Sequence, residues 1–441
     1  MNETHQIAEV GEAPQAPRWS LATRIAFRFC FVYFGLYCLA TQIVTSFYYS
    51  ADVDVPDPST LWPMRQIVFW TAAHVFRVTS PLVYKDSGSG DKTWDWVLAF
   101  CLLVIAALAT IGWSAFDRWR ENYVTLHKWF RVFIRLALVS QMVAYGLSKV
   151  IPLQMPFPYL RELLEPFGNF SPMGVLWSFV GASPAYEIFA GSAEMLAGIL
   201  LLFPRTTTLG ALVCLIDSTY IFTLNMTYDV PVKLFAFHLI LMCLFLLAPD
   251  ISRLADFFLR NRAVGASAQP RLFRTRRANR IALAVQILLG MWVVGINIYG
   301  GWIAWHTYGG ARPKSTLYGI WDVEEISIDG QVRSPLLTDK DRWRRMIFDF
   351  PERMNYQRMD DSFGGYATAI NVNDRTLALT KYDDKNWKAD FHFERAAPDQ
   401  LALDGKMDGH TIHMQLQLVG RDKFLLLTRG FHWIQEYPYN R

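Results

Sequence analysis

The sequence predicts an α-helical integral membrane bundle of about seven transmembrane helices, followed by an antiparallel β domain. Of its 441 residues, 52% are hydrophobic and 19% are charged, which is typical of a membrane protein with a soluble part attached. Long apolar segments fill the chain up to about residue 310, and apolar and polar residues alternate from about residue 315. These two patterns have the periods of helices and of strands, so they predict two domains.

Seven segments are apolar enough and long enough to cross the roughly 30 Å hydrocarbon core of a bilayer. They cover about 24–48, 93–115, 129–151, 185–203, 206–225, 232–249 and 281–303. The first twenty residues are polar and do not resemble a cleavable signal, so we expect a tail over residues 1–20 and an anchor in the first segment. The bundle is then expected to occupy residues 21–310.

Positively charged loops predict the orientation of the bundle, because Lys and Arg residues collect on the cytoplasmic side. They precede the first segment, separate the second from the third, and are densest in the linker 251–280. An odd number of spans then puts everything after about residue 310 on the opposite side. We therefore expect a multi-pass protein of a bacterial inner membrane, with a cytoplasmic N-terminus and a periplasmic β domain.

Two outer loops have features of their own. Residues 61–77 are rich in aromatic side chains but too short to span, which predicts an interfacial or re-entrant helix. Residues 152–184 contain repeated prolines, which exclude a long helix. We expect this second loop to fold over the mouth of the bundle.

Residues 315–441 predict a small up-and-down β-barrel. Their alternating pattern, as in "HTIHMQLQLV", is interrupted by Asp-Gly turn signals, and the length accommodates eight or nine antiparallel strands. The opening "YGIWDVEE" resembles the first strand of lipocalins, with Gly319 and Trp321 at the matching positions. The resemblance implies a lipocalin-like barrel in which a basic residue of the last strand, here Arg429, covers Trp321.

Polar side chains follow helical spacing on two of the apolar segments, where such residues are costly and usually face the bundle interior. The stripe on the fourth segment consists of Glu187, Gly191, Glu194 and Gly198. The stripe on the third segment consists of Gln141, Tyr145 and Lys149. Glycines admit another helix at close range, so the two carboxyl groups are expected to point into a helix contact.

More polar residues fall at the same depth on the fifth and sixth segments. The sequence therefore predicts a polar pocket in the outer half of the bundle. Its candidate catalytic residues are Lys149 and Glu194. Its candidate ligand-binding residues are Gln141, Tyr145, Glu187, Asp217, Tyr220 and His238.

Structural explanations of these residues stay open. Lys149 lies near a helix end and can extend to the interface, Glu194 can simply pair with Lys149 or Lys233, and a lone histidine such as His238 is often a hydrogen-bonded core residue. We expect no metal site, and the five cysteines form no CxxC pair that would predict disulfides or redox chemistry. A net charge of +4 gives no reason to expect nucleic acid as a partner.

The stretch "YGLSK", followed by "GSAEMLAGILLLFPRTTTLGAL", resembles the DoxX family of bacterial membrane proteins. The matching positions are Gly146, Lys149, Glu194, Gly198 and Arg205, within a core of about 129–250. The resemblance implies a four-helix core, and it associates the chain with quinone-linked oxidation or membrane oxidoreductase complexes.

Three functions remain open, and whether the chain is an enzyme is open with them. The first is a redox-associated protein that holds a quinone or another lipophilic head group in the polar pocket, beside a membrane redox partner. The second is a non-catalytic assembly protein whose barrel binds a lipophilic ligand or a periplasmic protein. The third follows from a loose resemblance to the vitamin K-dependent γ-carboxylase superfamily, which implies Lys149 as a base.

Overall fold

The computed structural model describes residues 18–47, 57–265 and 271–440, which fall into two compact units. One unit combines Met1–Val150 with Phe189–Gly301, and the other combines Ile151–Ile188 with Trp302–Arg441. Most of the predicted tail, residues 1–17, lies outside the described residues, as do residues 266–270 of the Arg-rich linker.

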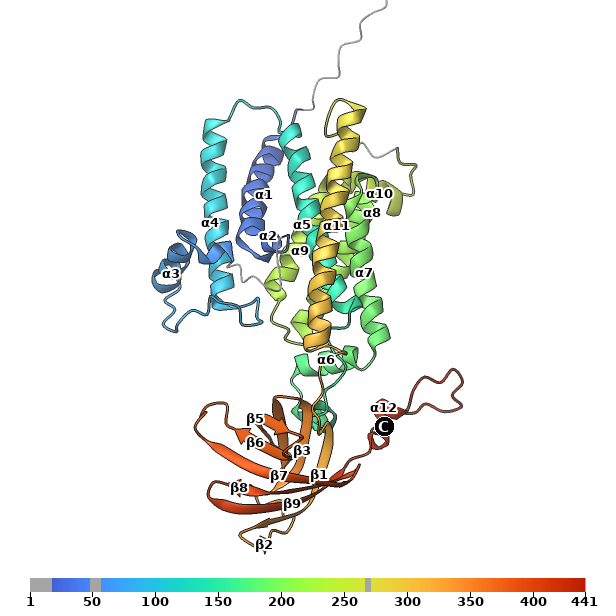
Figure 1. The fold of residues 1–441 in the computed structure, drawn as a ribbon. Coiled ribbons are helices and arrows are strands. Elements are labelled where there is room, and N and C mark those ends of the chain that lie inside the picture. The colour runs from blue at the N-terminus through green and yellow to red at the C-terminus, as the bar shows by residue number, and fades with distance from the viewer. Residues whose placement is uncertain (1–17, 48–56, 266–270, 441) are drawn as a thin grey trace, which may run out of the picture. The chain divides into compact units, whose positions relative to one another are not determined.

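The first unit is helical (Figure 1). Its principal helices are α1 (Leu21–Ala40), α2 (Gln42–Thr45), α3 (Met64–His74), α4 (Thr93–Phe116), α5 (Val124–Val150), α7 (Pro184–Leu202), α8 (Thr207–Thr227), α9 (Lys233–Leu247), α10 (Ile251–Phe258) and α11 (Arg276–Thr307). Both α7 and α11 continue from one unit into the other. The short turns η1 (Pro58–Thr60), η4 (Pro204–Thr206) and η5 (Ala248–Asp250) belong to the same unit.

Seven helical segments in the described ranges are long and apolar enough to cross a membrane. They match the seven predicted segments, although the first helix ends earlier than expected. It stops at Ala40 because Thr41 has an extended backbone, with φ −118° and ψ 177°, and the Thr41 hydroxyl donates to the Tyr37 carbonyl at 2.8 Å. The short α2 follows, and residue 48, the predicted end of the segment, lies outside the described residues.

Helix α3 lies inside the range where an interfacial helix was predicted. It buries Val68, Thr71 and Ala72, while Phe69 and Trp70 are exposed. One face therefore packs into the helical unit and the other carries aromatic side chains, as an amphipathic interfacial helix requires.

The second unit joins the loop after α5 to the C-terminal domain. Its helical turns are η2 (Glu162–Leu164), η3 (Phe167–Asn169), α6 (Pro172–Gly181), η6 (Arg421–Lys423) and α12 (Leu425–Thr428). Its strands are β1 (Gly319–Ile328), β2 (Gln331–Val332), β3 (Trp343–Phe350), β4 (Arg353–Arg358), β5 (Phe363–Asn371), β6 (Thr376–Thr380), β7 (Lys388–Ala397), β8 (Gln400–Met407) and β9 (His410–Leu418).

Eight strands, β1 and β3 to β9, form a closed antiparallel barrel (Figure 1). Each strand pairs with the next along the chain, and β1 closes the barrel by pairing with β9, with Trp321 opposite Leu418. The short β2 forms a hairpin on β1 through a turn at Asp329 and Gly330, both of which have positive φ. The predicted up-and-down barrel is therefore confirmed, and its lipocalin likeness stays a prediction.

Large side chains fill the interior of the barrel. Trp321 is fully buried and its indole N–H donates to the Leu317 carbonyl at 2.9 Å. The ring of Trp343 stacks on that of Tyr356, with centroids 4.5 Å apart. The interior therefore has a packed apolar core, as is usual for a small barrel.

Arg429 does not cover Trp321, so that prediction was wrong. It follows α12, beyond the last strand, and it contacts His432 and Gln435. The guanidinium that faces the Trp321 ring belongs to Arg395 of β7, at 5.6 Å from the ring centroid. A basic residue does lie over the tryptophan, but it comes from a different strand.

The proline-rich loop was expected over the mouth of the helical bundle. The structure assigns it to the second unit, where Leu160 packs with Ile320 and Ile347 of the barrel. The Leu160 N–H donates to Asp349 Oδ2 at 2.9 Å. These two contacts of the loop are made with barrel strands.

Candidate functional site

Helices α5 and α7 cross at their glycines. A Cβ atom added at Gly191 would lie 2.6 Å from the Gly146 carbonyl oxygen and 2.7 Å from Lys149 Cβ. Added at Gly146, it would lie 2.9 Å from the Gly191 carbonyl oxygen. The two backbones are thus in direct contact, which confirms the prediction that the glycines of the fourth segment admit another helix.

This crossing brings together the two predicted catalytic residues. The Lys149 ammonium donates to Glu194 Oε1 in a buried ion pair, and only 9% of the lysine side chain and 2% of the glutamate side chain are exposed. The pair connects the end of α5 to the middle of α7. Within the described part of the chain, the second oxygen, Glu194 Oε2, is buried without a hydrogen-bond partner.

Asp217 of α8 adds a second carboxylate to this cluster. It interacts electrostatically with both Glu194 and Lys149. Its Oδ2 atom is buried and has no hydrogen-bond partner among the described residues. One lysine therefore interacts electrostatically with two carboxylates, and a group of this composition in an apolar interior needs one more proton or another positive group to be neutral.

The predicted residues Gln141 and Tyr145 form a hydrogen-bonded extension of the cluster. Gln42 of α2 donates to the Tyr145 hydroxyl at 2.9 Å and to Gln141 Oε1 at 3.3 Å. Gln141 in turn donates to Ser46 Oγ at 3.0 Å. The Lys149 ammonium lies 5.8 Å from the centroid of the Tyr145 ring, so this network is continuous with the ion pair.

His238 occupies a hydrogen-bonded core position. Its Nδ1 lies 2.7 Å from the Leu234 carbonyl and its Nε2 lies 2.8 Å from the Tyr33 hydroxyl, so Nδ1 donates and Nε2 accepts. Its imidazole stacks on the Tyr37 ring, with centroids 3.7 Å apart. Both ring nitrogens have partners here, which agrees with the structural explanation for this residue.

Glu187 and Tyr220 were the other predicted ligand-binding residues. Glu187 belongs to the second unit and accepts the Met155 N–H at 2.9 Å. Tyr220 on α8 is 52% exposed. Lys233, the alternative partner for Glu194, instead pairs with Asp229 at 2.9 Å and with Asp91 at 3.8 Å.

An apolar groove of about 240 Å³ runs along the same helices. Val139 and Val143 of α5, Gly198 and Leu202 of α7, and Gly295 of α11 are among its lining residues. Gly198 follows Glu194 by four residues, which is about one helical turn or 6 Å. The groove therefore begins one turn from the ion pair.

A second buried cation, which the sequence reasoning missed, lies one turn beyond the other end of the groove. Arg135 is 4% exposed, and its guanidinium donates to Thr207 Oγ1 at 3.2 Å and to Gln286 Oε1. Arg135 precedes Val139 by four residues, and Gln286 precedes Gly290, another groove residue, by four. The signal that the sequence offers is a charged residue inside an apolar segment, as for Lys149.

Comparisons with known proteins identify one relative and assign no activity. The chain is 32% identical over 133 residues to the uncharacterized protein YwoB of Bacillus subtilis, a match that covers 28% of this chain and 79% of YwoB. No family model matches the chain. No solved structure matches it either.

Proposed function

We propose that this chain, which belongs to the same family as YwoB, is a membrane protein whose helical unit binds a lipophilic molecule, with a quinone as the candidate. The head group would lie at the cluster of Lys149, Glu194 and Asp217. The apolar tail would lie in the groove between α5, α7 and α11. The DoxX resemblance, which first suggested a quinone, remains a prediction.

One observation carries this proposal: a polar cluster with unsatisfied acceptors and an apolar groove share the α5–α7 seam, one helical turn apart. Sites for small lipophilic ligands combine an apolar lining with a few placed polar groups. Ionisable residues inside apolar helices usually mark such sites. The groove supplies the lining, and the ion-pair cluster supplies the polar groups.

The residues of the cluster suit a quinone-type head group. The ammonium of Lys149 is a donor for a carbonyl oxygen, and Glu194 Oε2 and Asp217 Oδ2 are open acceptors for a hydroxyl group. Two carboxylates and one lysine would need one additional proton at the same place to be neutral. A quinone supplies the redox chemistry when bound, and the chain's own residues hold the head group and the proton.

The membrane placement is part of the same proposal. Seven apolar helices support a multi-pass membrane protein. The loop charges support a cytoplasmic N-terminus, and with seven spans the barrel would lie in the periplasm of a bacterial inner membrane. A membrane redox partner or a periplasmic protein is the kind of partner that this arrangement suits.

Filling the groove tests the proposal without touching the ion pair. A Cβ atom added at Gly295 meets nothing within 4 Å, and the same holds for Gly300 on the same helix, which is not among the residues lining the groove. Titration of the purified chain with ubiquinone-2 and menadione, followed by thermal shift, should give saturable binding. Gly295→Leu should weaken binding at least tenfold, and Gly300→Leu should leave it unchanged.

Glu194→Gln is the second variant, because it removes the carboxylate and keeps the size of the side chain. It should also weaken binding at least tenfold. The proposal fails if neither compound binds saturably, or if the parent chain, Gly295→Leu and Gly300→Leu bind equally well.

A second function is supported by the closure of the ion pair. Only 9% of the Lys149 side chain and 2% of the Glu194 side chain are exposed. The pair would then serve only to hold α5 and α7 together, as in a non-catalytic assembly protein. Failure of both quinones to bind, together with loss of folded protein on breaking the pair, would favour this function. A carboxylase-type role for Lys149 stays a prediction, and it requires release of the ammonium from Glu194.

A further inference from the structure

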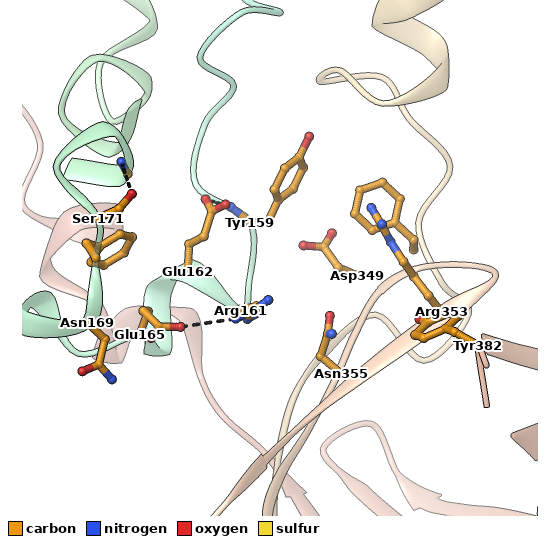
Figure 2. Close-up of a pocket in the computed structure, with 13 residues that line it drawn as sticks. Tyr159, Arg161, Glu162, Glu165, Asn169, Ser171, Asp349, Arg353, Asn355 and Tyr382 are labelled. Atoms are coloured by element: carbon orange, nitrogen blue, oxygen red, sulfur yellow. Dashed lines mark hydrogen bonds and ion pairs between the residues drawn. The ribbon is translucent and has the colours of Figure 1, made fainter. Parts of the chain in front are cut away.

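The second unit contains a cleft of about 610 Å³ between the proline-rich loop and the barrel (Figure 2). Residues 159–174 of the loop form one wall. The ends of β3 and β4, which face each other across a tight hairpin, form the other wall with Tyr382. Its volume lies within the range of about 300–1,000 Å³ that is usual for ligand clefts.

The walls of the cleft are fixed to each other. Asp349 accepts the Leu160 N–H at 2.9 Å and pairs with Arg312 at 2.6 Å. The Arg312 guanidinium lies over the rings of both Tyr159 and Phe350, at 4.6 and 4.9 Å from their centroids. These contacts tie the loop to the barrel, so the cleft exists before any ligand enters it.

Donors from the protein already engage each carboxylate of the cleft. Asp349 is held as described, Glu162 accepts the Tyr159 N–H at 3.0 Å, and Glu165 pairs with Arg161 at 3.6 Å. Burial raises the pKa of the Glu162 carboxyl above its ordinary value. The acidic side chains therefore help to build the cleft, and Glu162 and Glu165, unlike Asp349, leave part of their acceptor capacity open.

Other polar groups of the cleft remain available to a ligand. Arg353 stacks on the Phe350 ring, with its guanidinium carbon 3.8 Å from the centroid, and it makes no ion pair within the described residues. Tyr382 is 60% exposed. Asn355 makes one long contact of 3.5 Å from its amide nitrogen to the Gly364 carbonyl, and Figure 2 shows its amide group between the two walls.

The charges and shapes of these groups narrow the class of ligand. The cleft is lined by two guanidinium groups and three carboxyl groups, so it does not favour a strongly anionic ligand. The Arg353 guanidinium donates through paired N–H groups, and the Asn355 amide both donates and accepts. Such planar groups match the vicinal hydroxyls of a sugar. The exposed ring of Tyr382 matches the apolar C–H face of a sugar ring.

We propose that this cleft binds a neutral saccharide of two or three units. Arg353, Asn355 and Tyr382 would contact it from the barrel, and Asn169 and Phe170 would contact it from the loop. This site is independent of the quinone site proposed for the helical unit.

The test uses the full chain in detergent and two soluble probes, maltotriose and tri-N-acetylchitotriose, titrated by isothermal calorimetry. At least one probe should bind saturably. Arg353→Gln and Tyr382→Ala should each weaken that binding at least tenfold. Lys406→Gln on β8 and Tyr437→Ala in the C-terminal segment, where both residues are outside the cleft, should leave it unchanged.

Three results would overturn the proposal. The first is the absence of saturable binding for both probes up to their solubility. The second is equal binding by the cleft variants and the two control variants. The third is binding of citrate or inorganic phosphate that depends on Arg353 while neither sugar binds, because that result identifies an anion site.

Discussion

Each unit of this protein contains a buried ion pair that joins segments distant in the sequence, and the two pairs differ in how completely their carboxylates are hydrogen-bonded. In the barrel unit, both oxygens of Asp349 have a donor, from Arg312 and from the Leu160 N–H. In the helical unit, Glu194 receives Lys149 on one oxygen, and its other oxygen has no partner among the described residues.

This difference separates a structural ion pair from one that is suited to a ligand. A buried carboxylate with both oxygens satisfied holds its neighbours in one geometry and has little left to offer. A buried carboxylate with an open oxygen, beside a second carboxylate such as Asp217, carries a free-energy cost that a ligand or a proton can remove. The comparison thus places the candidate binding chemistry of the helical unit at Glu194 and Asp217.

Removing the lysine should produce the largest loss of stability. Lys149→Met leaves Glu194 and Asp217 buried without their cation, and breaking a buried pair from one side costs about 3–5 kcal/mol. The double variant Lys149→Met/Glu194→Gln removes both charges and should recover more than half of that loss. Urea unfolding of the purified chain in detergent, followed by tryptophan fluorescence, measures both values.

The control for this prediction is Lys233→Met, because Lys233 forms partly exposed pairs with Asp229 and Asp91. Its loss should be about 1 kcal/mol or less. If the double variant is as unstable as Lys149→Met, the residual carboxylates are not the source of the cost.

Asp349→Asn should have a smaller effect, which is confined to the barrel unit. The amide cannot accept from both Arg312 and the Leu160 N–H, so one charge-assisted hydrogen bond is lost, at a cost of about 1.5–3 kcal/mol. The loop should loosen, and trypsin should cleave the folded chain after Arg161 faster than in the parent. Glu165→Gln affects a pair with an arginine side chain that is 51% exposed, so it should change the cleavage rate little.

Faster cleavage in Glu165→Gln than in Asp349→Asn would contradict the comparison. It would mean that the partly exposed pair of Glu165 and Arg161, and not the buried Asp349 with its two donors, holds the loop on the barrel.

Local patterns were sufficient to predict most of the architecture. Apolar segments and loop signals predicted seven helices and a meander of eight or nine strands, because span length and strand alternation are properties of short windows. The contact between Lys149 and Glu194 was also within reach, since four-residue steps put glycine and charge on the same face of each helix. The end of α1 was missed because the break at Thr41 has no proline or glycine to mark it.

Contacts between segments far apart in the chain could not be predicted in this way. Gln42 of α2 hydrogen-bonds to Tyr145 of α5, which lies 103 positions further along the chain. No spacing of residues in the sequence predicts that α2 packs against this face of α5. The cleft is missed for the same reason, because its two walls come from residues 159–174 and from the β3–β4 hairpin. Charged residues such as Arg161 of the loop and Arg353 of β4 are expected from the sequence to be solvent-exposed, and only the fold shows that both line one cleft.

The smallest predicted effect concerns pH and the loop of the barrel unit. Burial raises the pKa of Glu162, the nearby Asp349 raises it further, and both Arg161 and the Tyr159 N–H oppose the shift. A carboxyl group whose pKa is higher in the folded state contributes stability below its unfolded pKa of about 4.3 and loses that contribution as pH rises through the folded value. Ionised Glu162 therefore makes the folded unit slightly less stable at neutral pH than at pH 4.

Glu162→Gln isolates this contribution, because glutamine keeps an acceptor for the Tyr159 N–H and does not ionise. The melting temperature of the variant minus that of the parent should rise between pH 4 and pH 8, by about 1–2 °C. All other titrating groups cancel in this difference, since both chains share them. A difference that is flat or falls with pH would show that the hydrogen bond from the Tyr159 N–H lowers the pKa of Glu162 at least as much as burial raises it. Ionised Glu162 would then stabilise the loop, as Asp349 does.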